Sequence, residues 1–569
     1  MPLSRSNLAA VALLALLPLR ATAEESAEPT EKVEAAKNWS DTAIRISPLI
    51  TLENHGYFRF RFNLFHRMDL GADGASGVAA NPDSSSTTSE SANIRLRYEP
   101  SLLVGEFLTV HARIDFLDNV VLGGHPDTGG YYAPFPFLGR SQSSPSAGSN
   151  GNRDAIRVKA AWADLRLFQR FHVWGGRIPQ RFGLGIVRSD GSDPDSDFGD
   201  YSDGVHVMIR LPAAYVRAGM EFPGEGTTAE SPLRNFWDPH DPEQTDDITR
   251  WVFVFDSSPM EKEELNARQH ELNVERKTVL DWGMYHSLTT QSMSSDKIGG
   301  QISSQCGEGT LKPFGLDYDC YTLTPRKAFF WTPALWGRLL YHPREDLKIR
   351  IEAELAAVYG YVDYTQSFLD ASEDKTRKEF FQVGAALEAD VEFGDNLVEF
   401  LFGVASGDGT SNNFGILDNH TLVQPNDMEY RNEQKRDPAV SENTSVGTFV
   451  FNRDYRVDSI LFREVIGAVT NAFYFKPAYH RAFLRTPGHF IRGGLSLMAA
   501  FATVAEGVPG GKRPLGLEGG IHLLYRMGNH LTVKADGAVL YPLTGMKLPG
   551  SSSDPRVAAA LRLMMAVKF

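Results

Sequence analysis

Beyond its first twenty residues, the 569-residue chain lacks any apolar run long enough to cross a bilayer as a helix, which takes about 18 or more consecutive apolar residues. Cysteine is almost absent. Cys306 and Cys320 share one polar stretch, so we predict a single loop disulfide and exclude a disulfide-rich scaffold. A net charge of −14 without a basic domain argues against nucleic acid as a partner.

Motifs for chemistry are also lacking. The sequence contains no C-x-x-C or H-x-x-x-H metal spacing, no phosphate-binding glycine loop, and no G-x-S-x-G that would place a nucleophilic serine beside a histidine. We therefore expect neither a cofactor nor an enzyme.

The N-terminal stretch is typical of secretion. Arg5 precedes an apolar run from Leu8 to Leu19, and Ala21-Thr22-Ala23 suits a signal peptidase. The alternative is a single anchoring helix, which Pro18 and Arg20 disfavour. We predict a signal peptide over 1–23, a periplasmic extension over 24–47, and one domain over 48–569.

That domain repeats a period-two pattern in runs of about ten residues, the length that a tilted membrane strand needs. In the first run, Phe58, Phe60 and Phe62 alternate with Arg59 and Arg61. Similar runs occur near 94–99, 108–116, 205–211, 347–355, 381–393 and 531–539. Lipid would cover the apolar face and water or the lumen the polar face. The fourth predicted strand shifts phase around Ala160-Ala161, as a β-bulge would make it do, and the segment from Pro259 to Lys277 has a helical pattern.

Short and long connections alternate along the chain. Short ones contain residues such as Gly394-Asp395-Asn396, and long polar ones lie near 70–91, 118–154, 181–203, 223–246, 290–325 and 409–447. This asymmetry is typical of outer-membrane barrels of Gram-negative bacteria. We predict an all-β, antiparallel up-and-down transmembrane barrel of about eighteen strands, with short periplasmic turns and long extracellular loops.

The last strand strengthens this prediction. Val557, Leu561, Leu563, Met565, Val567 and Phe569 lie on one face. A terminal aromatic residue on such a strand resembles the signal read by the outer-membrane insertion machinery. Outer-membrane lipids and that machinery are thus the expected partners; the number of subunits stays open.

Charges on the predicted inner face are distributed unevenly. The basic wall consists of Arg59, Arg61, Arg95, Arg97, Arg113, Arg157, Lys159, Arg177, Arg210, Arg217 and Arg562. The acidic wall consists of Glu352, Glu354, Glu388, Asp390, Glu392 and Glu399. Facing walls of opposite sign orient polar solutes, and arginines favour anions. Mutual pairing is the alternative, but few acidic partners lie near the arginines in the sequence.

Two segments are candidates to enter the lumen. The third long loop carries Asp190, Asp193, Asp195, Asp197, Asp200 and Asp203, and is predicted to form a constriction. Asp193, Asp195 and Asp197 also offer oxygen ligands to calcium, although the glycine is misplaced for a helix-loop-helix calcium site. The segment 454–466 is either a short helix, with Asp454 or Asp458 as cap and Gly467 as its end, or an irregular strand.

Ala405-Ser406-Gly407-Asp408 resembles a turn of the alginate-export-like outer-membrane porins. That resemblance implies an eighteen-stranded barrel with an arginine-rich lumen that passes anionic polysaccharide or small solutes. The segment from Asp454 to Pro477 is similar to large uncharacterised barrels of myxobacteria. The acidic strands after residue 347 depart from a uniformly basic lumen.

The leading hypothesis is a porin-type outer-membrane channel for small polar or anionic solutes. The alternatives are export of an anionic polysaccharide and a surface adhesin or receptor that works through its long loops.

Overall fold

We analysed a computed structural model of the chain. It describes residues 44–47, 49–71, 87–121, 156–168, 170–224, 247–259, 262–298, 320–363, 377–409, 445–547 and 554–569. The predicted signal peptide and most of the predicted extension lie outside these residues. Cys306 does as well, and with it the predicted disulfide to Cys320. All described residues belong to one compact unit, Thr42–Phe569.

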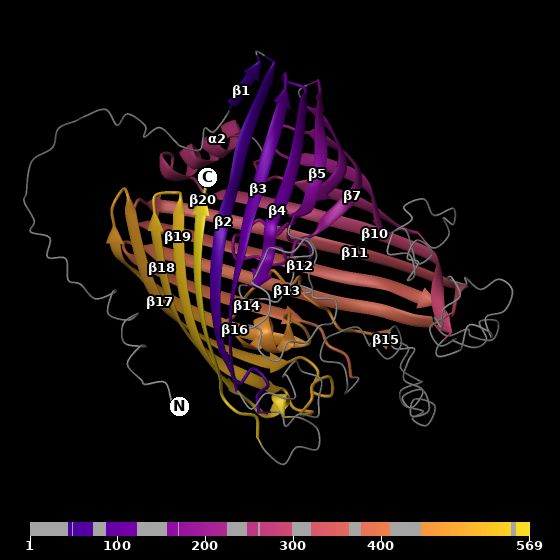
Figure 1. Ribbon diagram of the computed structural model, residues 1–569, viewed down its shortest axis with the longest axis vertical. Helices are drawn as coiled ribbons and strands as arrows, with labels where there is room; N and C mark the ends of the chain where they lie inside the picture. The colour runs from indigo at the N-terminus through magenta and orange to yellow at the C-terminus, as the bar shows by residue number, and fades with distance from the viewer. Residues whose placement is uncertain are drawn as a thin grey trace, which may run out of the picture. The chain divides into compact units, whose positions relative to one another are not determined.

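One antiparallel sheet dominates the described residues (Figure 1). Its first strands are β1 (Ile44–Ser47), β2 (Ile50–His66), β3 (Thr88–Val104), β4 (Leu108–Val121), β5 (Ile156–Leu167), β6 (Phe171–Pro179), β7 (Tyr201–Arg210), β8 (Tyr215–Gly224), β9 (Ile248–Asp256) and β10 (Val279–Ile298). The second half comprises β11 (Cys320–Arg344), β12 (Leu347–Asp363), β13 (Arg377–Phe393), β14 (Asn396–Ala405), β15 (Ser445–Val446), β16 (Ala472–Arg485), β17 (His489–Ala502), β18 (Pro514–Met527), β19 (Leu531–Pro542) and β20 (Ala558–Lys568).

Pairing of β20 with β2 closes the sheet into a barrel, from Tyr57 opposite Lys568 to His66 opposite Ala559. Two of the twenty strands are short additions. β1 pairs with the start of β2, and β15 pairs in parallel with β13 beyond the end of β14. The remaining eighteen strands form the wall, which confirms the predicted fold and strand count.

Short turns lie at one end of the barrel, where β2 begins and β20 ends. One connection at this end contains a helix, α2 (Lys262–Asn273), between β9 and β10. Its helical character was visible in the sequence. Among the described residues, no helix is both long and apolar enough to span a bilayer.

Alternation places side chains on two faces, as predicted. On β2, Arg59 and Arg61 are buried inside, and the phenylalanines between them face outward. Outward apolar side chains stay highly exposed around the barrel, for example Leu495, Ile521 and Val539 at 61%, 66% and 52%. A surface of this kind is stable only when lipid covers it.

A β-bulge in β5 shifts the register against β4, because Arg113 pairs with Ala160 and Ile114 with Val158. Lys159 is the extra residue. The phase change at Ala160-Ala161 predicted this irregularity. A bulge here changes the faces on which the side chains at the start of β5 lie.

The interior is less polar than predicted. Inner faces of β9–β20 carry a large apolar cluster that includes Ala386, Ala472, Ala500 and Ala558. Small side chains leave room for two chain segments, which pack against them inside the barrel through residues such as Ile186 and Leu461. We name these the β6–β7 segment (residues 180–200) and the β15–β16 segment (residues 447–471).

Candidate functional site

The β6–β7 segment folds into the lumen; that it forms a constriction for solutes stays a prediction. Near its start, the carboxylate of Glu354 on β12 accepts hydrogen bonds from the backbone N–H groups of Gly185 and Ile186 at 2.9 and 3.3 Å. Glu354 is almost fully buried. The acidic residue therefore anchors the segment to the wall and is not open to a solute.

Arginines of β2 and β3 hold the tip of the same segment. Arg59 donates to the carbonyl oxygens of Pro194 and Ser196 at 3.0 and 3.3 Å, and Arg95 donates to that of Ser196 at 2.7 Å. Arg61 forms ion pairs with Asp195 at 3.1 Å and Asp197 at 2.7 Å. A guanidinium group carries several N–H donors in a rigid fork, which suits this multiple binding.

The next arginines along the wall continue this clamp. Arg97 donates to the carbonyl oxygen of Gly191 at 2.5 Å and pairs with Asp115 on β4 at 2.7 Å. Arg113 donates to the carbonyl oxygen of Asp190 at 2.6 Å. The expectation that these arginines find few acidic partners is wrong, because the partners come from β4 and from a segment distant in the sequence.

The β15–β16 segment supplies two arginines that the sequence did not single out. Arg456 pairs with Asp197 at 2.6 Å and with Asp195 at 3.3 Å. Arg463 binds both carboxylate oxygens of Asp195 at 2.9 and 3.0 Å. Their presence in a stretch with helical apolar spacing was the available signal, but their partners lie more than 250 residues away.

A turn of π-helix, Leu461–Ile466, ends the inward path of this segment. Asp458 accepts the N–H groups of Phe462 and Arg463, and Gly467 ends the helix with a φ of 94°. The helical alternative is thus observed over Leu461–Ile466 only; Ile460 holds the N-cap position, and Asp458 binds two N–H groups of the helix from two residues before it. Glu518 on β18 anchors the turn, because it accepts the N–H groups of Ser459, Ile460 and Leu461.

Charge at this crossing of the two segments is unequal. Four guanidinium groups, of Arg59, Arg61, Arg456 and Arg463, contact the two carboxylates of Asp195 and Asp197. Burial would raise the pKa of Asp197, but Arg61 and Arg456 outweigh it and hold that pKa well below its usual range. Asp197 and Asp195 therefore stay ionised. Asp454 contacts Arg456 at 3.6 Å, and Glu464 contacts Arg463 at 3.7 Å and Arg562 at 2.5 Å, so five guanidinium groups face four carboxylates at the crossing.

Other aspartates of the β6–β7 segment have structural partners. Asp190 accepts from the backbone and hydroxyl of Ser192, Asp193 from the N–H of Asp195, and Asp200 from Ser189 and Asn452. The described residues contain no group of three or more acidic, histidine or cysteine side chains placed to hold a metal. The proposed calcium ligands Asp195 and Asp197 bind arginines instead.

The acidic wall is partly neutralised by one residue. Arg350 on β12 contacts Glu352 at 2.7 Å, Glu388 at 2.8 Å and Asp390 at 2.7 Å. Of the others, Glu354 accepts backbone N–H groups, Glu392 pairs with Arg485 at 2.9 Å and Lys348 at 4.0 Å, and Glu399 contacts His480 at 2.7 Å.

Two predicted lumen residues lie elsewhere. Arg177 on β6 and Asp203 on β7 are paired residues of neighbouring strands, and their side chains form an ion pair at 2.6 Å. On its other side Arg177 pairs with Ala161 of β5, which is exposed on the outer face. The side chains of Arg177 and Asp203 both face out of the barrel, and Asp203 belongs to β7 and not to the loop. Alternation within β6 is unbroken here, because His172 and Ile178 are buried on the inner row and Arg177 lies on the other row. The prediction assigned Arg177 to the wrong row.

Pairing of β5 with β6 begins only at Ala161 and Arg177, so the first residues of β5, 156–160, pair with β4 alone. A space of about 880 Å³ lies there, and it joins inner groups such as Arg97 to outer ones such as Arg177. Arg157 and Lys159 line it, and Lys159 pairs with Asp118 at 2.6 Å.

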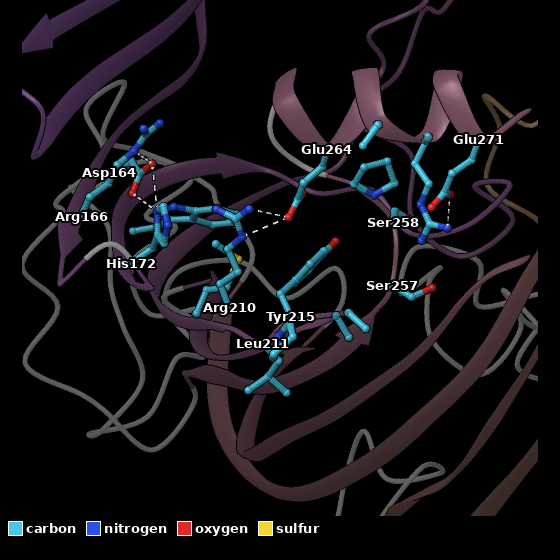
Figure 2. A pocket seen from close by; sticks show the side chains of 18 residues that line it. Asp164, Arg166, His172, Arg210, Leu211, Tyr215, Ser257, Ser258, Glu264 and Glu271 are labelled. Atoms are coloured by element: carbon cyan, nitrogen blue, oxygen red, sulfur yellow. Dashed lines mark hydrogen bonds and ion pairs between the residues drawn. The ribbon is translucent and has the colours of Figure 1, made fainter. Parts of the chain in front are cut away.

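A second cavity, of about 370 Å³, lies at the short-turn end between α2, the adjoining ends of β5–β8 and the residues that follow β9 (Figure 2). Arg210 crosses it to Glu264 of α2 at 2.6 Å. Arg217 stacks on the Trp174 ring, 5.5 Å from its centroid. On the opposite side of the barrel, Arg562 binds Asn63 and Glu464, which ties the last strand to the π-helical turn.

Known structures of similar fold are distant. No family model and no curated protein matches the chain. The chain is similar to outer-membrane porins. OccAB3 of Acinetobacter baumannii has 10% identity and a TM-score of 0.44 over 91% of this chain and 99% of that one. OccK11 (OpdR) of Pseudomonas aeruginosa has 12% identity and a TM-score of 0.41 over 91% of this chain and 96% of that one. A BenF-like porin of Pseudomonas fluorescens Pf-5 has 9% identity and a TM-score of 0.41 over 91% of this chain and 98% of that one.

Proposed function

We propose that this chain is an outer-membrane channel of porin type that passes small polar solutes and prefers anions. The supporting observation is a closed eighteen-stranded barrel with an apolar outer face whose interior is crossed by two anchored, charged segments. A barrel of this size leaves an aqueous lumen unless chain segments fill it. The two segments would narrow that lumen to a selective passage.

The positive surplus at the crossing supports the preference for anions. Five arginines against four carboxylates leave one positive charge in excess, and a narrow, partly dehydrated passage strengthens the attraction of that charge for an anionic solute. Arg456 and Arg463 reach the crossing from the β15–β16 segment and are proposed as selectivity residues, beside the wall arginines Arg59 and Arg61.

Small solutes fit this arrangement better than a polymer. Both segments are fastened by backbone hydrogen bonds to buried glutamates, so a chain of sugars would have to displace them. The resemblance to alginate-export-like porins therefore stays a prediction about the family, and we do not extend it to passage of a polysaccharide.

Planar-bilayer recording tests the proposal. The purified protein should give discrete conductance steps, and a potassium chloride gradient should produce a reversal potential of the sign expected for anions. Replacing both Arg456 and Arg463 by glutamine should shift that potential toward the cation side while the barrel stays folded by heat-modifiable gel mobility. A barrel that never conducts, or one that prefers cations before any substitution, contradicts the proposal.

A further inference from the structure

Three neighbouring strands bring a serine, a histidine and an aspartate together inside the barrel. Ser496 Oγ on β17 lies 2.8 Å from Nε2 of His522 on β18, and Nδ1 of His522 lies 2.7 Å from Oδ1 of Asp536 on β19. This is the order of contacts in a serine hydrolase, where the base uses Nε2 toward the nucleophile and Nδ1 toward the carboxylate. No sequence motif predicted it, because the three residues come from separate strands.

These side chains face the lumen and water can reach them. Their sequence neighbours Leu495, Ile521 and Leu523 are highly exposed on the outer face, so the alternating residues point inward. The side chains of His522 and Asp536 keep exposures of 22% and 29%. The two side chains are therefore not sealed in a core.

Glycine makes the serine–histidine contact possible. Gly520 lies directly opposite Ser496 in the β17–β18 pairing. A Cβ atom at position 520 would lie 2.6 Å from Ser496 Oγ and 2.9 Å from His522 Nε2. Any larger residue would push the two groups apart, so the local sequence Gly519-Gly520 leaves a gap where the nucleophile and base meet.

We propose that Ser496, His522 and Asp536 form a hydrolytic site for small carboxylic esters that carry an anionic group. This activity is separate from conduction. The anionic preference comes from the cations Arg492, Arg526 and Lys534, which lie on the same inward rows of β17, β18 and β19 toward the short-turn end. At about 3.3 Å per residue, these positions lie roughly 7 to 13 Å along the strands from the triad.

The reaction has two steps, with water as the second reactant. Ser496 Oγ attacks the ester carbonyl carbon as its proton moves to His522 Nε2. The bond to the alkoxy oxygen then breaks, and that oxygen takes the proton from Nε2 and leaves as the alcohol. Water attacks the acyl-serine, passes a proton to Nε2, and releases the acid as Ser496 Oγ regains the proton. Asp536 stays ionised and orients the ring through Nδ1–H.

Two chromogenic probes test the site on the purified full-length protein. 4-Acetoxybenzoate places a carboxylate about 7 Å from the acyl carbon, within the range of the cations, and 4-acetoxybenzamide is its neutral counterpart. We expect hydrolysis of both, with kcat/KM about tenfold higher for the anionic probe. A fluorophosphonate should label Ser496, as identified by mass spectrometry of the peptide.

Variants separate chemistry from folding. Ser496→Ala and His522→Ala should each lower kcat about 100-fold or more, and Gly520→Ala should do so about tenfold without removing a reacting group. Asp536→Asn should lower kcat with little change in KM, and Asp536→Glu should restore part of it. Ser101→Ala is the matched control, because Ser101 contacts a lumen histidine, His111, through Nδ1 alone and should leave hydrolysis unchanged.

Single-channel conductance of every variant shows that its barrel is intact and keeps this result independent of the channel proposal. The inference is overturned if the wild type hydrolyses neither probe, if Ser496→Ala retains the wild-type rate, or if the fluorophosphonate labels another residue. Loss of hydrolysis in Ser496→Ala with unchanged conductance supports it, whatever solutes the channel passes.

Discussion

Neutralising Asp195 should release the crossing of the two inner segments. Its carboxylate contacts Arg61 at 3.1 Å, Arg456 at 3.3 Å and Arg463 at 2.9 Å, and its side chain is 21% exposed. Asp195→Asn removes the negative charge and leaves three partly buried guanidinium groups facing one another. Breaking a buried ion pair by removing one partner typically costs about 3–5 kcal/mol.

Residual exposure places the expected cost at the low end of that range, about 3 kcal/mol. At about 1.4 kcal/mol for each factor of ten, the equilibrium between the anchored and released segment would shift about 100-fold toward release. The mean single-channel conductance and the open-channel current noise should both rise. The preference for anions should also increase, because the five guanidinium groups would then face three carboxylates, those of Asp197, Asp454 and Glu464.

Asp193→Asn is the matched control for this change. The substitution is chemically the same and lies two residues earlier in the chain. The carboxylate of Asp193 accepts a hydrogen bond from the N–H of Asp195 at 2.7 Å, and the amide oxygen of asparagine can accept the same bond. If Asp195→Asn and Asp193→Asn give the same conductance, noise and reversal potential, the arginine clamp does not hold the segment and the reasoning is refuted.

Three further outcomes follow from other contacts. Glu518→Gln weakens three charge-assisted hydrogen bonds to the π-helical turn, so limited proteolysis there should speed up, by an amount equivalent to about 1–3 kcal/mol of local stability; an unchanged cleavage rate contradicts the anchor. Burial, reinforced by Glu518, raises the pKa of Asp458 to about 8, so the protonated form is favoured in the folded turn and stability falls as pH rises through about 8. Current noise should accordingly increase above pH 8 in the wild type and not in Asp458→Asn, and equal noise in both argues against this origin. Leu563→Arg, on the outer face of β20, should lower unfolding free energy in lipid vesicles by about 2–4 kcal/mol, whereas Leu563→Met should change it little; equal stability of the two variants would mean that lipid does not cover this face.

Sequence reasoning was accurate where one local rule decides the outcome. The alternation of Arg59 and Arg61 with phenylalanines predicted which face is inside, and the phase change at Ala160-Ala161 predicted the bulge. It failed at Arg177, which lies on the outward row of β6 opposite Asp203 of β7. It also treated the lumen as uniformly polar, because alanines on inner faces give no sign that another segment will cover them.

Function-bearing residues depended on contacts between distant parts of the chain. Most basic residues of the inner wall were found from the sequence, but not that arginines of β2, β3 and β4 clamp the β6–β7 segment. Arg456 and Arg463, and the group of Ser496, His522 and Asp536, were missed. The arginines act on partners far away in sequence, and the other three meet only when three strands align in register.

By itself, the sequence determined the barrel, its strand number and its two faces, because a period of two and unequal loops are local properties that a bilayer sorts by hydrophobicity alone. Tertiary structure decided what fills the lumen and which polar groups meet there. Ion pairs and hydrogen bonds act over a few ångströms, so their partners are set by strand register and by the return of two segments into the barrel. The residue pattern within a single strand does not specify which residues of other strands and segments come within that range.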